Sequence, residues 1–354
     1  MARDRAMLRF PWKQSGRSLF ALGSLSWRDP EGARFHVVAF SYVALSYTIG
    51  IFAIVSSSFI FNLAGILLLA HSLVIAAYLL HECAHHSVFI SAPQNARLGS
   101  VLAWLTGACY SGFERVRRKH LRHHVEQADI LAWDYRGWLS RHACARDAVE
   151  LLESLWLPAV ELLMHIAAII LPFVDAEYRE RRAHIIKLLL IRAALLFILA
   201  WIQPWAPVYY AVAYLLFMQV LRFMDVFQHS YLLRFTLTSP LQRAKNPADY
   251  EESHTFSNLL SSRWPVLNLL VLNFCYHNIH HQQPLLSWYR LPLRHREMYG
   301  DTCPQQIGFS NQLRWFHRYR RERVMAAVDD SQSGPMTPDA EMVGATGVSF
   351  VTAI

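Results

Sequence analysis

The chain has 354 residues, of which 54% are hydrophobic, and it carries a formal net charge of +8 and 18 histidines. Its apolar residues gather in long runs, which argues against an ordinary soluble protein. The positive charge is typical of cytosolic loops in membrane proteins, and we prefer this interpretation to nucleic-acid binding. Five scattered cysteines without a CxxC pair argue against a disulfide framework and suit a reducing compartment.

Two apolar blocks are each long enough for a pair of membrane spans. The first, 35–80, is interrupted by the polar run 56–58, and the second, from about 185 to 227, contains Pro204 and Pro207. A span needs about 20 apolar residues, and proline interrupts a helix. We therefore predict an all-α integral membrane protein, with two transmembrane hairpins under a cytosolic helical cap and interfacial helices. The predicted spans lie near 36–57, 60–80, 185–203 and 208–228.

The distribution of Lys and Arg predicts the orientation. Residues 1–34 carry seven of them, 81–184 carry twelve and the chain from His229 onward carries twelve, while the two turns carry none. The positive-inside rule then places both termini and the active site on the cytosolic side, at the plasma membrane if the source is bacterial. The predicted parts are a basic N-terminal segment (1–34), a membrane domain (35–300) with its cap at 81–184 and 229–300, a C-terminal helix (301–325) and a disordered tail (326–354).

Two shorter apolar stretches complicate the count of spans. Residues 151–174 are interrupted by Glu153, Pro158 and Glu161, and residues 264–276 are too few to cross a bilayer. We expect interfacial or re-entrant helices at both places. A fifth span at 151–174 stays an open alternative.

Three histidine clusters carry the functional interpretation. They are HECAHH at 81–86, HLRHH at 120–124 and HNIHH at 277–281. Residues at i, i+3 and i+4 share a helix face, so each cluster directs two or three imidazoles to one point. The predicted topology places all three on the same side of the membrane. Neutral imidazole suits iron, zinc or copper, and so many histidines exceed the needs of one ion. We therefore expect two metals.

This pattern resembles the membrane fatty-acid desaturase family over roughly residues 35–300. The most specific stretches are HECAHHS (81–87), RKHLRHH (118–124) and YHNIHHQQPLLSWYRLP (276–292). The resemblance implies two iron ions, O2 as co-substrate and a ninth histidine near the end of the fourth span, where this chain has His229. The implied iron ligands are His81, His85, His120, His123, His124, His229, His277, His280 and His281. His86 is an additional histidine that we leave outside this set.

The resemblance also points to acidic residues beside the metals. Animal acyl-CoA members have an asparagine four residues before the ninth histidine, and it holds a metal-bound water. This chain has Asp225 there. An acidic side chain is able to do the same, so we expect Asp225, together with Glu82 of the first cluster, next to the ligands.

The remaining histidines receive structural interpretations. We expect His71, inside the second span, to hydrogen-bond a neighbouring helix or to line a substrate path. We expect His165, His184 and His295 at the membrane interface, and His254 in a solvent-facing loop.

The function implied by the resemblance is the O2-dependent formation of a double bond in a fatty acyl chain. No fused electron carrier is evident, so we expect a separate ferredoxin, rubredoxin or cytochrome with its reductase. Basic residues around the second cluster suit a phosphate-bearing head group, an acidic donor surface, or simply the positive-inside rule. They are Arg115, Arg117, Arg118, Lys119 and Arg122.

Three alternative functions fit parts of the sequence. A hydroxylase or ketolase of a lipid, alkane or carotenoid would use the same scaffold. His81-Glu82-x-x-His85 also matches the HExxH motif of zinc proteases, with the glutamate as general base, but that function leaves the other two clusters unexplained. A metal or haem carrier would need ligands within the spans near the midplane, where only His71 is clearly placed. The acyl carrier, the chain length, the position of the new bond and the oligomeric state are not encoded in any motif.

Overall fold

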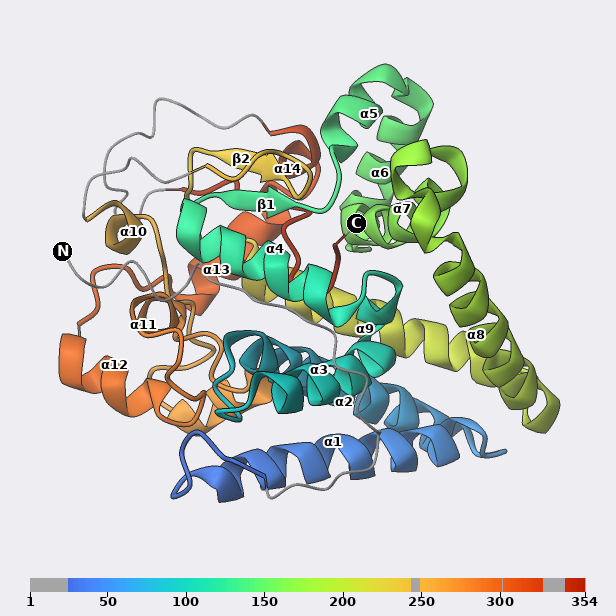
Figure 1. The fold of residues 1–354 in the computed structure, drawn as a ribbon, viewed down its shortest axis with the longest axis horizontal. Coiled ribbons are helices and arrows are strands. Elements are labelled where there is room, and N and C mark those ends of the chain that lie inside the picture. Colours follow the sequence, from blue (N-terminus) through green and yellow to red (C-terminus); the bar gives the residue numbers. More distant parts are fainter. Residues whose placement is uncertain (1–24, 243–248, 301, 327–340, 354) are drawn as a thin grey trace.

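The computed structural model describes residues 25–242, 249–300, 302–326 and 341–353, which are mostly helical (Figure 1). Among the described residues, four helical segments are long and apolar enough to cross a membrane. They are α1 (Ala33–Ile54), α2 (Phe59–His85), η2 with α8 (Ala176–Arg181 and Arg182–Ile202) and α9 (Ala206–Asp225). Each overlaps a predicted span. The predicted all-α membrane fold class is therefore confirmed.

Glycines and an asparagine shape the first hairpin. A Cβ atom on Gly65 would lie 3.0 Å from the carbonyl oxygen of Gly50, so glycine permits α1 and α2 to approach closely. Asn62 closes the turn, because its Nδ2 donates to the carbonyl oxygens of Ala53 at 3.0 Å and Ser56 at 2.9 Å. These bonds satisfy acceptors that the end of α1 leaves unpaired.

α2 and α8 differ sharply in the fraction of their residues that is buried. In the apolar window of α2, 67% of the residues are buried, against 11% in the η2–α8 segment. The outer side chains of α8 include Leu190, Phe197 and Trp201, which are 66%, 66% and 81% exposed. Such a surface suits contact with lipid. α2 extends to His85, so the first histidine cluster lies on a long, buried helix.

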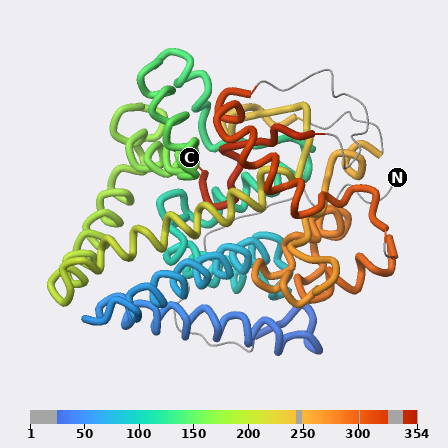
Figure 2. Tube along the Cα trace, turned by 180° about the vertical axis from the view of Figure 1, so that it is seen from behind, coloured from blue at the N-terminus to red at the C-terminus, as the bar shows by residue number. Residues whose placement is uncertain are grey.

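The other described residues form shorter elements, several of which lie on one side of the α1–α2 pair (Figures 1 and 2). The helices are α3 (Ala92–Thr106), η1 (Ala108–Tyr110), α4 (Phe113–Glu126), α5 (Tyr135–Arg141), α6 (Ala143–Ser154), α7 (Ala159–Val174), α10 (Tyr250–Ser253), η3 (Pro265–Val271), α11 (His277–Gln282), α12 (Leu291–Tyr299), α13 (Phe309–Arg318) and α14 (Glu322–Met325). The predicted helix at 301–325 is thus represented by two, α13 and α14.

Two short strands join distant parts of the chain. β1 (Asp129–Leu131) follows α4, and β2 (Arg234–Thr236) follows α9. They pair in parallel with Asp129 opposite Arg234. Strands of three residues carry too little periodicity to be predicted. Their pairing brings the end of the second histidine cluster next to the chain around His229.

The stretch 151–174 is not one continuous helix, because α6 ends at Ser154 and α7 begins at Ala159. The two glutamates that interrupt its hydrophobicity have a structural partner. Arg222 on α9 is buried and forms ion pairs with Glu153 and with Glu161, the latter at 3.0 Å. The acidic residues therefore attach α6 and α7 to a candidate span.

The C-terminal residues differ from the predicted disordered tail. Within 341–353, Ala353 is fully buried, and Nζ of Lys119 donates to the carbonyl oxygen of Ser349 at 2.7 Å. The segment has no hydrophobic periodicity, so its sequence carried no signal of order. Several of its small side chains are nevertheless buried, and its carbonyl groups accept hydrogen bonds from the buried Lys119. The rest of that predicted tail, 327–340, and residues 1–24 lie outside the described residues.

Candidate metal centre

The first histidine cluster lies at the end of α2. His81 and His85 are separated by one helical turn, so they lie on the same side of the helix, and both are buried. The helix stops there because His86 adopts a left-handed backbone conformation with φ of 58°. The carbonyl group of His86 accepts a hydrogen bond from Arg28 Nε at 2.5 Å.

The second cluster lies on α4, and its geometry separates its three histidines. Successive residues of an α-helix are rotated by about 100°. His120 and His124 therefore share one side of α4 and approach His85, while His123 is turned toward His229.

The third cluster, on α11, divides in the opposite way. His277 and His281 share one side of the helix and approach His229, whereas His280 lies near His81. Each of the two short helices therefore contributes two histidines to one neighbourhood and one histidine to the other.

All nine histidines expected as ligands meet in two groups. Within each group the candidate ligand atoms lie within 4.8 Å of one another. The first group is His81, His85, His120, His124 and His280, and the second group is His123, His229, His277 and His281. Four or five ligands are the usual content of one transition-metal site. Two groups of this size fit two metal ions.

The imidazoles meet through their Nε2 atoms. Nε2 of His120 lies 2.7 Å from that of His85 and 3.0 Å from that of His124. In the second group, Nε2 of His229 lies 2.9 Å from that of His123 and 2.8 Å from that of His277. A neutral imidazole has one proton for two nitrogens, so these contacts leave lone pairs facing one another. A shared cation would satisfy them.

The protonation state of the groups also suits a metal. Burial lowers the pKa of His123 to about 4 and that of His280 to about 3, because an imidazolium loses its hydration there. Both are neutral near pH 7, which is the form that binds metals. His81 has both ring nitrogens buried without a hydrogen-bond partner, and His281 has Nε2 in that state. These unpaired ring nitrogens are suited to bind a metal ion that prefers nitrogen ligands, such as iron.

In two of these histidines, the ring nitrogen that points away from the group, Nδ1, donates a hydrogen bond to a neighbouring residue. Nδ1 of His123 donates to the carbonyl oxygen of Ala128 at 2.8 Å, and Nδ1 of His281 donates to Oε1 of Glu251 at 2.9 Å. Such contacts fix the tautomer and leave Nε2 for the metal. Sequence reasoning missed the role of Glu251 because it lies in none of the three clusters. Its proximity to His254 was the one available signal.

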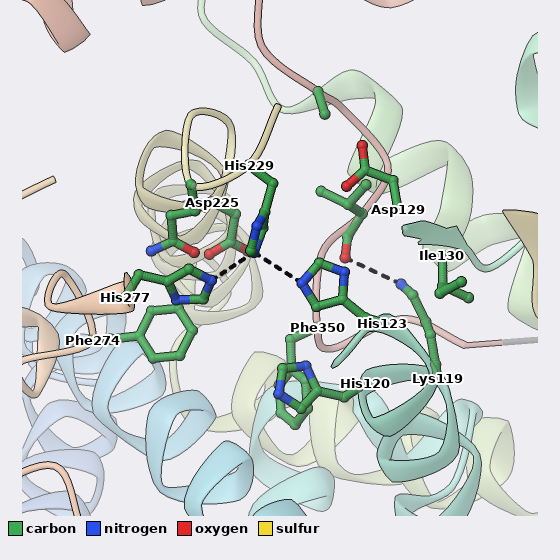
Figure 3. A pocket seen from close by; sticks show the side chains of 13 residues that line it. Lys119, His120, His123, Asp129, Ile130, Asp225, His229, Phe274, His277 and Phe350 are labelled. Carbon is green, nitrogen blue, oxygen red and sulfur yellow. Dashed lines mark hydrogen bonds between the residues drawn. The ribbon is translucent and has the colours of Figure 1, made fainter. Parts of the chain in front are cut away.

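A small cavity lies beside the second group (Figure 3). Its volume is about 50 Å³, which is room for a few water-sized molecules. Asp225 lies on its wall next to His229. Phe274 borders the cavity beside His277 and Phe350 borders it beside His120, with ring centroids 5.1 Å and 5.0 Å apart, respectively.

Glu82 hydrogen-bonds to residues outside the two histidine groups. Its Oε2 accepts hydrogen bonds from Ser87 Oγ at 2.7 Å and from the backbone N–H of Trp288 at 3.3 Å. It lies outside both histidine groups and connects the first cluster to the chain after α11. The general base of a zinc protease has to face the metal-bound water, so this position argues against the protease alternative.

Two histidines outside the groups have clear structural roles. His71 on α2 hydrogen-bonds through Nδ1 with the hydroxyl group of Tyr42 on α1 at 2.5 Å, as expected of a contact between helices. His254 differs from the prediction of a solvent-facing residue. It is 3% exposed, its ring stacks on that of Tyr250, and its Nδ1 donates to the carbonyl oxygen of the same tyrosine. His86 belongs to neither group.

The basic residues of the second cluster differ in exposure. Lys119 and Arg122 are buried, and Arg122 forms an ion pair with Glu126. Nε of Arg117 donates to the carbonyl oxygen of Ala84 at 3.0 Å. Lys119, Arg122 and Arg117 also connect α4 to other segments, through the carbonyl oxygens of Ser349, Leu237 and Ala84.

Comparison with known proteins agrees with this geometry. The family model described as fatty acid desaturase matches residues 57–312, more than half of the chain. The matched region contains all three histidine clusters and His229. A comparison with curated proteins finds no significant match. With four candidate spans, nine converging histidines and this match, the chain belongs to the fatty acid desaturase family.

Proposed function

We propose that the protein is a membrane oxidoreductase that uses O2 to introduce a double bond into a fatty acyl chain. The observation that carries this proposal is the convergence of nine imidazoles into groups of five and four. Family membership supports a fatty acyl substrate, and the candidate spans support access from a bilayer.

The two histidine groups would each hold one iron ion. When bound, the pair of irons supplies the oxidising power needed to remove hydrogen from unactivated methylene carbons. In the balanced reaction, –CH2–CH2– with O2, two electrons and two protons gives –CH=CH– and two water molecules. The electrons come from a separate carrier, for which a ferredoxin, rubredoxin or cytochrome is the proposed class.

The protein's own residues prepare this reaction in three ways. The histidines present neutral Nε2 atoms in a fixed arrangement, which avoids reorganisation when the metal binds. Phe274 and Phe350 border the cavity with apolar surface and limit access of water. Asp225, next to His229, is placed to hold a water molecule or a proton on the cavity wall.

We further propose that the metal centre faces the cytosol. The support is the concentration of Lys and Arg in 1–34, 81–184 and the chain after His229. All three histidine clusters lie at the ends of candidate spans or outside them. A single orientation of the chain in the membrane therefore places all three clusters on the cytosolic side.

The test is expression of the full chain in a host with a simple lipid profile, followed by mass spectrometry of its fatty acids. A new acid lighter by two hydrogens supports desaturation, and one heavier by one oxygen would indicate a hydroxylase instead. Metal analysis of the purified protein should find two irons per chain. A single zinc would overturn the proposal. His280→Ala should abolish the new product, whereas the exposed His142→Ala should preserve it.

A further inference from the structure

Glu251 lies where the second and third histidine clusters meet. It belongs to α10, and its side chain is 30% exposed. Its Oε1 accepts a hydrogen bond from Nδ1 of His281 at 2.9 Å, and its Oε2 lies 3.5 Å from Nε2 of Gln127, at the end of α4. The carboxylate is therefore held from both sides.

The same carboxylate approaches both histidine groups. An oxygen of Glu251 and one ring nitrogen each of His124 and His281 lie within 4.8 Å of one another. His124 belongs to the first group and His281 to the second. Among the described residues, no other acidic residue joins the histidines in such a group. Of these two histidines, His281 of the second group is the one that is hydrogen-bonded to Glu251.

The hydrogen bond to His281 has a direct consequence for the metal ligands. Because a carboxylate accepts from Nδ1, the proton of His281 resides on that nitrogen and Nε2 carries the lone pair. Nε2 of His281 is buried without a hydrogen-bond partner and is thus available to an ion. The comparable contact of His123 uses the neutral carbonyl oxygen of Ala128. A charged acceptor forms a stronger bond and increases the basicity of the ligand more.

We propose that Glu251 is a positioning residue of the second metal site, where it fixes His281 and strengthens it as a ligand. This inference rests on the proposed two-metal centre. Loss of an outer contact of this kind typically weakens metal binding about 10- to 100-fold. Removal of the carboxylate should therefore weaken the binding of one metal ion and leave the affinity for the other unchanged.

The experiment compares Glu251→Gln and Glu251→Ala with a matched control, Glu252→Gln. Glu252 is the next residue on the same short helix, but its side chain is exposed and it lies outside all of the metal-ligating groups. Each metal-free, full-length protein is titrated anaerobically with ferrous ion. The Mössbauer spectrum of the 57Fe-loaded form then reports the two iron environments separately.

The wild type and Glu252→Gln should bind two ions and show two ferrous environments. In Glu251→Gln, one ion should bind about 10- to 100-fold more weakly and one environment should change, and Glu251→Ala should show the larger effect. Unchanged affinity and spectra in both variants, or equal weakening of the two sites, would overturn the inference while the two-metal centre stands. A wild-type chain that binds fewer than two ions would overturn the proposed function itself, and this inference with it.

Discussion

Lys119 on α4 and Ser349 near the C-terminus are joined by a buried hydrogen bond of 2.7 Å from Nζ to the carbonyl oxygen. The lysine directly precedes His120 of the first group. Phe350, one residue after Ser349, places its ring 5.0 Å from that of His120. The segment 341–353 therefore forms part of the wall around the candidate metal centre.

Deletion of residues 341–354 should consequently open this wall. Each lost buried hydrogen bond costs about 1 kcal/mol. Lys119 makes two such bonds to this segment, to Ser349 and Thr352, and a part-buried one to Val348. We expect a lower melting temperature and faster removal of iron by a chelator, followed by absorbance. A truncated protein that releases iron at the wild-type rate would show that the segment does not shield the centre.

Two adjacent histidines provide a second test. His85 belongs to the first group and has its Nε2 2.7 Å from that of His120, whereas His86 belongs to neither group. His85→Ala should lose iron and abolish product formation. His86→Ala should retain both, since its ring is not among the converging donors. Iron content and fatty-acid profiles of the two variants measure this directly, and loss of iron in His86→Ala would contradict the assignment.

The metal-free protein should lose stability in mild acid. The pKa of His123 is lowered to about 4 and that of His280 to about 3, against 6.5 for an ordinary histidine. Between pH 6.5 and about 4 the unfolded chain therefore binds more protons than the native one, so the free energy of unfolding falls as the pH falls. Above pH 6.5 both states are neutral at these residues, and this contribution vanishes. Thermal melts of metal-free protein across this range provide the measurement. A melting temperature independent of pH would contradict the prediction.

The buried ion pairs of Arg222 lead to a stability prediction. Arg222→Met leaves Glu153 and Glu161 buried without their partner, which typically costs about 3–5 kcal/mol. The triple variant with Glu153→Gln and Glu161→Gln removes the uncompensated charges, so it should recover much of the loss. Unfolding in detergent, followed by circular dichroism, compares them. Equal melting temperatures for wild type and Arg222→Met would refute the structural role.

The sequence by itself determined the features that depend on local pattern. Apolar runs of sufficient length predicted the four candidate spans, because crossing a bilayer requires continuous hydrophobicity. The i, i+3, i+4 spacing identified the three histidine clusters, and the family resemblance implied the nine histidines that the structure brings together.

The tertiary structure alone decided how these parts combine. The division of the histidines into five and four depends on how α2, α4 and α11 are rotated against one another. Glu82 faces Ser87, and Glu251 faces His281, although both are acidic residues near histidines in the sequence. Lys119 and Ser349 are 230 residues apart in the chain, and contacts at that separation leave no trace in local periodicity.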